Sequence, residues 1–341
     1  MKKNLFIALS ISFLSFGFTN TVFAQAAESV EITGSLAQKF AAGIIEANLK
    51  TNLYMIASDE FEGRNTGEPG QKLAAKYLKD FYVERNIVSP FGGNNYFQEI
   101  STKYLMPNSM PSENVVAFIK GSEKPDEIVV ISAHYDHLGI DENGEIYNGA
   151  DDNGSGTVAV MAIAEAFQKA FEEGNGPKRS ILFLHVTGEE KGLVGSKYYV
   201  NFPIFPLKNT VADLNIDMIG RTDEAHEKDP NYIYLIGSNK LSTQLHNLSE
   251  EMNNKFTKLN LDYTYNMDSD PNRFYYRSDH YNFAKNNIPV IFYFNGIHEN
   301  YHQPSDTPDK INYELLAKRT QLVFYTAWEI ANRENRIAVD K

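Results

Sequence analysis

From residue 127 onward, short apolar runs alternate with segments whose apolar residues recur at helical spacing. The apolar runs have few polar positions, which is typical of strands in a sheet covered on both faces. This alternation predicts an α/β fold, a single three-layer domain on a mostly parallel (mixed) twisted sheet with helices on both faces. The expected strands are residues 127–133, 180–187, 210–220, 232–238 and 288–296; the expected helices are 36–57, 67–85, 156–171, 195–202, 240–256, 278–287 and 312–335.

The N-terminus has two lysines, a long apolar stretch and small residues at "VFA" and "AQA", the pattern of a secretory signal peptide. We expect residues 1–25 to be removed, which would leave 26–341 as the mature domain, secreted or periplasmic. An uncleaved anchor is the alternative. No other stretch of the sequence is apolar enough to span a bilayer.

Charge and cysteine content exclude several kinds of function. The formal net charge is −12, and loss of Lys2 and Lys3 would lower it to −14. Such an acidic chain is not expected to bind nucleic acid or an anionic membrane. The chain has no cysteine, which excludes disulfides, thiolate ligands and a cysteine nucleophile. Any bound metal must therefore be held by histidines and carboxylates.

Acidic residues and histidines follow the expected strands at the points where they end. In open α/β sheets, sites lie beyond the carboxyl ends of the strands. Each residue alone has an ordinary explanation, such as a turn, a helix cap or a solvated surface group. Their coincidence at one edge of one sheet favours a site. The residues are His134, Asp136, His137, Asp151, Asp152, Glu189, Glu190, Asp217, His298, His302, Asp306 and Asp309.

So many acids close together need compensating positive charge, and Lys191 and Arg221 are not enough. A pair of divalent cations would supply it, and such pairs lie ~3.5–4 Å apart with a shared carboxylate. Zinc accepts imidazole and carboxylate ligands. Glu189 and Glu190 could then divide two tasks, with one binding a metal and its neighbour acting as general base.

The motifs "HYDHLG", "GADDNGSG", "TGEEKGLVGS", "NIDMIGR", "SDHYNFAKNNIPV" and "YHQPSDTPDKI" together resemble the co-catalytic zinc aminopeptidases of metallopeptidase family 28. "LYMIASDEFEGRNTGEPGQKLAAKYL" resembles the segment that these enzymes carry upstream. The resemblance extends from about Leu53 to about Tyr313. The protease-associated insert of many secreted relatives is missing, since only a short stretch fills its place.

The resemblance implies two zinc ions, with Asp152 as their shared ligand. It places one ion on His134 and Asp217 and the other on Glu190 and His302. The same comparison implies two further catalytic roles. Glu189 resembles the general base, and Asp136 resembles the acid that orients the other ring nitrogen of His134.

Other residues are assigned less directly. Tyr275 matches a tyrosine that contacts the substrate carbonyl in some family members, with Tyr276 as its rival. Asp306 is expected to support His302. We interpret His137 and His280 as structural and His185 as a residue of the sheet core. The resemblance also implies a cis peptide between Asp152 and Asn153, which lets the bridging carboxylate point between two metals as the chain enters a helix.

The expected function is that of a secreted zinc exopeptidase, an aminopeptidase that removes N-terminal residues from peptides by a metal-bridged water with Glu189 as base. A carboxypeptidase is an alternative and would need a cation for the substrate carboxylate, for which Arg221, Arg273 and Arg277 are unassigned. A glutaminyl cyclase is a second alternative. A non-enzymatic binding module is the least favoured, because this chain keeps every ligand. Oligomeric state and side-chain preference stay open.

Overall fold

The computed structural model describes residues 35–105 and 110–341. The predicted signal segment 1–25 lies outside the described residues. The chain divides into two units, Met1–Lys39 and Phe40–Lys341. Only residues 35–39 of the first unit are described, and they are helical.

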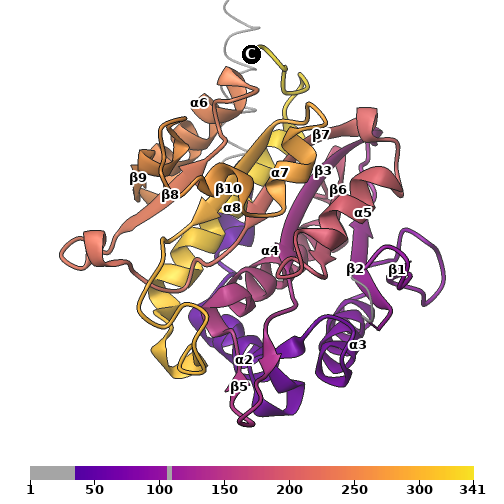
Figure 1. The fold of residues 1–341 in the computed structure, drawn as a ribbon. Coiled ribbons are helices and arrows are strands. Elements are labelled where there is room, and N and C mark those ends of the chain that lie inside the picture. The colour runs from indigo at the N-terminus through magenta and orange to yellow at the C-terminus, as the bar shows by residue number, and fades with distance from the viewer. Residues whose placement is uncertain (1–34, 106–109) are drawn as a thin grey trace, which may run out of the picture. The chain divides into compact units, whose positions relative to one another are not determined.

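An eight-stranded mixed sheet forms the centre of the second unit (Figure 1), in the order β1-β2-β6-β3-β7-β10-β8-β9. Its four middle strands, β6, β3, β7 and β10, run parallel to one another. β1, β2 and β8 join antiparallel, and β9 extends the sheet parallel to β8. The strands are β1 Phe97–Ile100, β2 Ser112–Ile119, β3 Lys124–His134, β6 Arg179–Val186, β7 Thr210–Ile216, β8 Tyr232–Ile236, β9 Asn260–Asp262 and β10 Val290–Phe294; a separate hairpin pairs β4 Gly139–Ile140 with β5 Ile146–Tyr147.

Helices pack on both faces of the sheet, as the alternating sequence predicts. On one face, Val130 of β3 and Leu182 and Leu184 of β6 belong to an apolar cluster with Tyr199 of α5 and Phe283 of α7. On the other face, α4 and α8 contact β3 and β6 and are joined by aromatic contacts. The helices are α2 Glu46–Ile56, α3 Pro69–Glu84, α4 Gly156–Glu172, α5 Val194–Asn201, α6 Thr243–Met252, α7 His280–Ala284 and α8 Tyr313–Asn332.

The predicted α/β fold is therefore confirmed, with the burial pattern as its physical basis. Every residue of β6, β7 and β10 is buried. Strands buried on both faces need apolar side chains on both, which explains the continuous apolar runs. Among the described residues, none of the helices has the length and hydropathy needed to cross a bilayer.

Three local predictions were wrong or incomplete. The helix expected over 36–57 is interrupted by a turn at residues 42 and 43, and α2 begins only at Glu46. Residues 89–112, for which the sequence predicted neither a helix nor a strand, contain the edge strand β1, whose half-exposed pattern gives a weak signal. β2 was also missed. Its hydrogen-bonding partners are β1 and the distant β6, so the sequence nearby did not reveal it.

Candidate metal centre

The carboxyl ends of the four parallel middle strands bring the predicted ligands together. His134 is the last residue of β3, and Asp217 directly follows β7. Glu190 lies in the loop after β6, and His302 in the loop after β10. Asp152 comes from the turn that precedes α4. Neighbouring parallel strands end at the same edge of a sheet, so residues far apart in sequence meet there.

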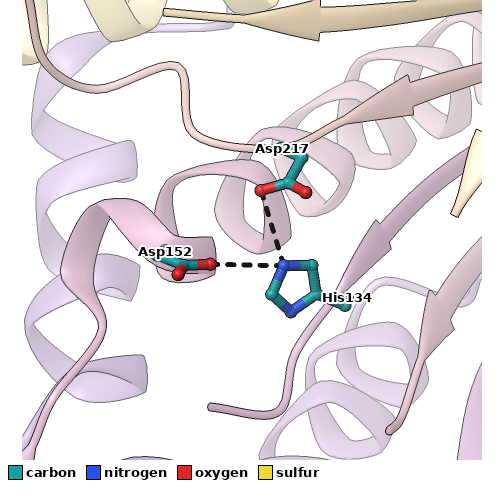
Figure 2. A group of neighbouring side chains, drawn as sticks. All are labelled: His134, Asp152 and Asp217. Atoms are coloured by element: carbon teal, nitrogen blue, oxygen red, sulfur yellow. Dashed lines mark ion pairs between the residues drawn. The ribbon is translucent and has the colours of Figure 1, made fainter. Parts of the chain in front are cut away.

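The first group consists of His134, Asp152 and Asp217, whose side chains point toward one another (Figure 2). His134 Nε2 lies 3.3 Å from Asp152 Oδ1 and 3.4 Å from Asp217 Oδ1. Ser278 donates a hydrogen bond to the other oxygen of Asp217. Burial alone would lower the pKa of His134, but Asp217 and Asp152 raise it well above its ordinary value. These three ligand atoms could hold one metal ion.

The second group uses the other oxygen of Asp152. His302 Nε2 lies 3.0 Å from Asp152 Oδ2 and 3.4 Å from Glu190 Oε1. His137 Nδ1 lies 3.0 Å from the same Glu190 oxygen. Burial would raise the pKa of Asp152, but His137, His134 and His302 hold it well below the usual range. Asp152 thus has one oxygen in each group, as a carboxylate shared by two ions requires.

These residues fit zinc by their chemistry. The donors are carboxylate oxygens and imidazole nitrogens, which zinc prefers in the absence of cysteine. His134 and Asp152 are almost fully buried. An unpaired carboxylate such as that of Asp152 is costly in a buried place. The ligand set implied by the family resemblance is therefore one cluster in space.

Glu189 and Glu190, although adjacent, have different environments. Burial, together with repulsion from Glu190, raises the pKa of Glu189 well above its usual value, although His134 opposes the shift. Burial would also raise the pKa of Glu190, but hydrogen bonds with His137 and His302 bring it below its usual value. The pKa values of the two neighbours therefore shift in opposite directions, because Glu190 is hydrogen-bonded to histidines.

Asp136 supports the site differently from the sequence-based prediction. His134 Nδ1 lies 3.1 Å from the main-chain carbonyl of Asp136 and 3.7 Å from its carboxylate. The carboxylate oxygens are instead occupied by the hydroxyl of Thr66 at 2.7 Å and the backbone N–H of Glu189 at 3.2 Å. The carbonyl of Asp136 thus orients His134, while its carboxylate positions Glu189.

Asp306 also differs from its predicted role. Its carboxylate accepts hydrogen bonds from the backbone N–H groups of Asp151 and Asp152, and so holds the shared ligand rather than His302. Nε2 of His298, another of the residues predicted to follow a strand, lies 3.1 Å from the Asp151 carboxylate. The predicted cis peptide between Asp152 and Asn153 is confirmed.

Tyr275 does not line the pocket beside the predicted ligands. It lines a separate surface pocket with Lys240 and Tyr276, and it packs against His280. Tyr301 instead lines the pocket at the metal ligands, one residue before His302. The position of Tyr301 next to His302 in the sequence was the signal that could have identified it, whereas the motif resemblance indicated the tyrosines before "SDH". The pocket is lined by Asp152, Glu189, Asp217, Met218, Phe274, Arg277, Ser278, Phe292, Phe294, Ile297 and Tyr301.

His137 was expected to be structural, yet its ring touches the ligand cluster. Its Nδ1 is paired with Glu190, and its ring lies edge-on to that of His302 with centroids 5.8 Å apart. The ring fits because residue 149 is glycine, where a Cβ would come within 2.5 Å of it. Sequence spacing could not distinguish His137 from a core histidine, since its partner is 53 residues away.

The four parallel middle strands of the mixed sheet thus carry two histidine–carboxylate groups at their carboxyl ends, next to a pocket. The chain belongs to Peptidase family M28, whose profile matches residues 114–327. The family resemblance seen in the motifs is thus confirmed.

Relatives agree with this assignment. A probable leucine aminopeptidase of Arthroderma benhamiae is 31% identical over 229 residues, which are 64% of this chain and 57% of that protein. A probable zinc metalloprotease of Pyrenophora teres f. teres is 31% identical over 163 residues, 46% of this chain and 32% of that protein. The match therefore spans only about a third to three fifths of these curated relatives. The crystal structure of LapB from Legionella pneumophila shares the fold, with a TM-score of 0.69 at 24% identity over 87% of this chain and 75% of that one.

Proposed function

We propose that this chain is a dinuclear zinc aminopeptidase. The observation that carries the proposal is the division of the Asp152 carboxylate between two ligand groups, next to a glutamate whose pKa is raised. His134 and Asp217 would hold one ion, and Glu190 and His302 the other. When bound, the ions would act as Lewis acids on the scissile carbonyl.

Glu189 would act as the general base of the reaction. It lies on the wall of the pocket with Asp152 and Asp217, and its backbone is anchored by Asp136. A carboxylate with a raised pKa can accept a proton from the attacking water and pass it to the leaving amine near neutral pH. The acidic cluster would also attract the positively charged amino terminus of a peptide.

The pocket supports an apolar residue at the N-terminus of the substrate. Phe274, Phe292, Phe294, Met218 and Ile297 line it beside the metal ligands. Burying a leucine side chain against such walls is worth ~1.5–3 kcal/mol relative to leaving it in water. Leucine is also the residue named for the Arthroderma relative, which agrees with this preference.

A carboxypeptidase is the second candidate, and one observation favours it. Of the three arginines left unassigned by the sequence, only Arg277 lines the pocket with Glu189, where it also contacts the Tyr301 hydroxyl. Arg273 lines the separate pocket with Tyr275. A guanidinium at this place could pair with a substrate carboxylate.

The deciding experiment combines metal analysis with blocked substrates. Purified protein that has never been exposed to a chelator should contain two zinc ions. It should cleave leucyl dipeptides with an amidated C-terminus and leave N-acetylated ones intact. The reverse preference would establish the carboxypeptidase, and ammonia release from N-terminal glutamine would establish the cyclase. Absence of bound metal would refute all three.

Export of the chain is a separate part of the proposal. It rests on the apolar N-terminal sequence and its small-residue cleavage pattern. N-terminal sequencing of the protein recovered from the producing cells should show a start near residue 26. An intact Met1 in the membrane fraction would favour the anchor.

A further inference from the structure

Arg64 is a buried arginine that no ligand motif contains. Its side chain is fully buried, and it lies upstream of the residues matched by the family profile. The chain reaches it through Gly63, whose φ is 62° and whose absent Cβ would come within 2.5 Å of the carbonyl oxygens of Gly139 and Tyr147. A glycine is therefore required before Arg64 for the chain to pass this close to β4 and β5.

The Arg64 guanidinium donates to main-chain carbonyls of three separate segments. Nε donates to Tyr135 at 2.7 Å, and Nη2 donates to Gly149 at 2.9 Å. Nη1 donates at 2.7 Å to both Asn148 and Ile56. The planar fork of arginine has the donor geometry for such a set, which a lysine lacks.

Two of these segments carry the candidate ligands. Tyr135 is the residue between His134 and Asp136, and Gly149 lies three residues before Asp152. The carbonyl of Arg64 also accepts the backbone N–H of His137 at 3.2 Å. One residue thus ties the end of β3 to the turn that bears the shared carboxylate. Both metal groups depend on the relative position of these two segments.

Arg64 also supplies positive charge that the sequence alone did not place. Burial lowers the pKa of its guanidinium to about 10, against the opposing attraction of Asp136, Asp152, Asp306 and Glu190. The group therefore remains charged at neutral pH. A fixed cation this close offsets part of the repulsion among the carboxylates before any metal binds.

We infer that Arg64 is a positioning residue for the metal centre, which sets the spacing of the His134 and Asp152 segments through their main-chain carbonyls. The inference rests on the proposed dinuclear function. It predicts that changes at Arg64 weaken metal binding itself, beyond any general loss of stability.

The test compares Arg64→Lys and Arg64→Met with Arg179→Lys as the matched control. Arg179 is equally buried and also donates to backbone carbonyls, those of Ile330, Arg333 and Glu334. It stands at the start of β6, at the opposite end of that strand from Glu189. Zinc dissociation constants are measured on the full chain by competition with a chromophoric chelator, and the melting temperature is measured without metal.

We expect both Arg64 variants to bind zinc ~10–100-fold more weakly, the range found for residues that orient metal ligands. Arg179→Lys should bind zinc like the unaltered chain even where its melting temperature falls. If Arg64→Met does not fold, the zinc dissociation constant of Arg64→Lys decides whether the inference holds.

Zinc affinity of Arg64→Lys within threefold of the unaltered chain would overturn the inference. An equal loss in Arg179→Lys would do the same, as would failure of both Arg64 variants to fold, since each outcome makes Arg64 part of the general scaffold. Failure of the proposed function is distinguishable, because the unaltered chain itself would then bind no zinc.

Discussion

The carboxylate of Asp136 accepts a hydrogen bond from the backbone N–H of Glu189, with 3.2 Å between Oδ1 and N. This bond joins the loop after β3 to the loop after β6, two strands that are parallel neighbours in the sheet. Asp136, which lies two residues after the proposed metal ligand His134, thus holds the main chain of Glu189, the proposed general base. The ligand His134 and the base Glu189 are therefore positioned by one short segment.

The role of Asp136 can be tested by comparing two substitutions. Asp136→Ala removes the acceptor for Glu189, so kcat should fall by ~10–100-fold, the range for second-layer partners of metal sites. Asp136→Asn keeps an oxygen that can accept the same hydrogen bond and should retain at least tenfold more activity than the alanine variant. Steady-state kinetics with leucyl substrates, together with zinc content, make the comparison. Equal activity of the two variants would contradict the positioning of Glu189.

Substitutions of the two adjacent glutamates should affect activity and zinc content differently. Glu189→Gln cannot accept a proton, and removal of a general base costs ~10²–10⁴-fold in kcat. Zinc content and substrate affinity should change little in this variant. Glu190→Gln should lose metal and activity together. Near-normal turnover of Glu189→Gln with both metals bound would show that Glu189 is not the base.

His137 should strengthen the binding of the ion that Glu190 and His302 would hold. The hydrogen bond from its Nδ1 to Glu190 orients that carboxylate. His137→Phe should weaken one of two zinc-binding steps by ~10–100-fold and leave the other near its original strength. His137→Asn, which can still donate, is the matched control. Calorimetric titration of metal-free chain resolves the two steps, and two unchanged affinities in His137→Phe would exclude this role.

Acid should destabilise the chain through His185, a buried histidine of β6. Burial lowers the pKa of His185 to about 3, and its Nε2 pairs with the Tyr82 hydroxyl. An unfolded histidine takes up its proton near pH ~6.5. The unfolded state therefore binds more protons between these values, and the free energy of unfolding falls as pH drops below about 6.5.

At pH 5 the loss from this one group should be ~2 kcal/mol relative to pH 7.5. Urea unfolding of metal-free chain at the two pH values measures it. His185→Gln can still accept from Tyr82 but cannot be protonated, so its loss between the same pH values should be smaller by about this amount. If both chains lose the same free energy, His185 is not responsible.

The sequence was sufficient where a property depends on local pattern. Apolar runs such as 180–187 predicted buried strands, and the polar residues at their ends predicted where a site would form. It was insufficient where a partner lies far along the chain. Tyr135, which accepts from Arg64, is 71 residues away from it, and nothing local to either residue indicates the pairing. The strand β2 was missed for the same reason, since its partner β6 lies far along the chain.

By itself, the sequence determined the fold class and the group of acidic residues and histidines at one edge of the sheet, because the carboxyl ends of neighbouring parallel strands lie at a common edge. Only the tertiary structure decided the distances between these residues and the environment of each. It assigned one Asp152 oxygen to each ligand group, gave Glu189 and Glu190 opposite pKa shifts, and placed Tyr301 rather than Tyr275 at the pocket. Such features depend on burial and on distances of a few ångströms between side chains from different loops, and these arise only when the loops pack together.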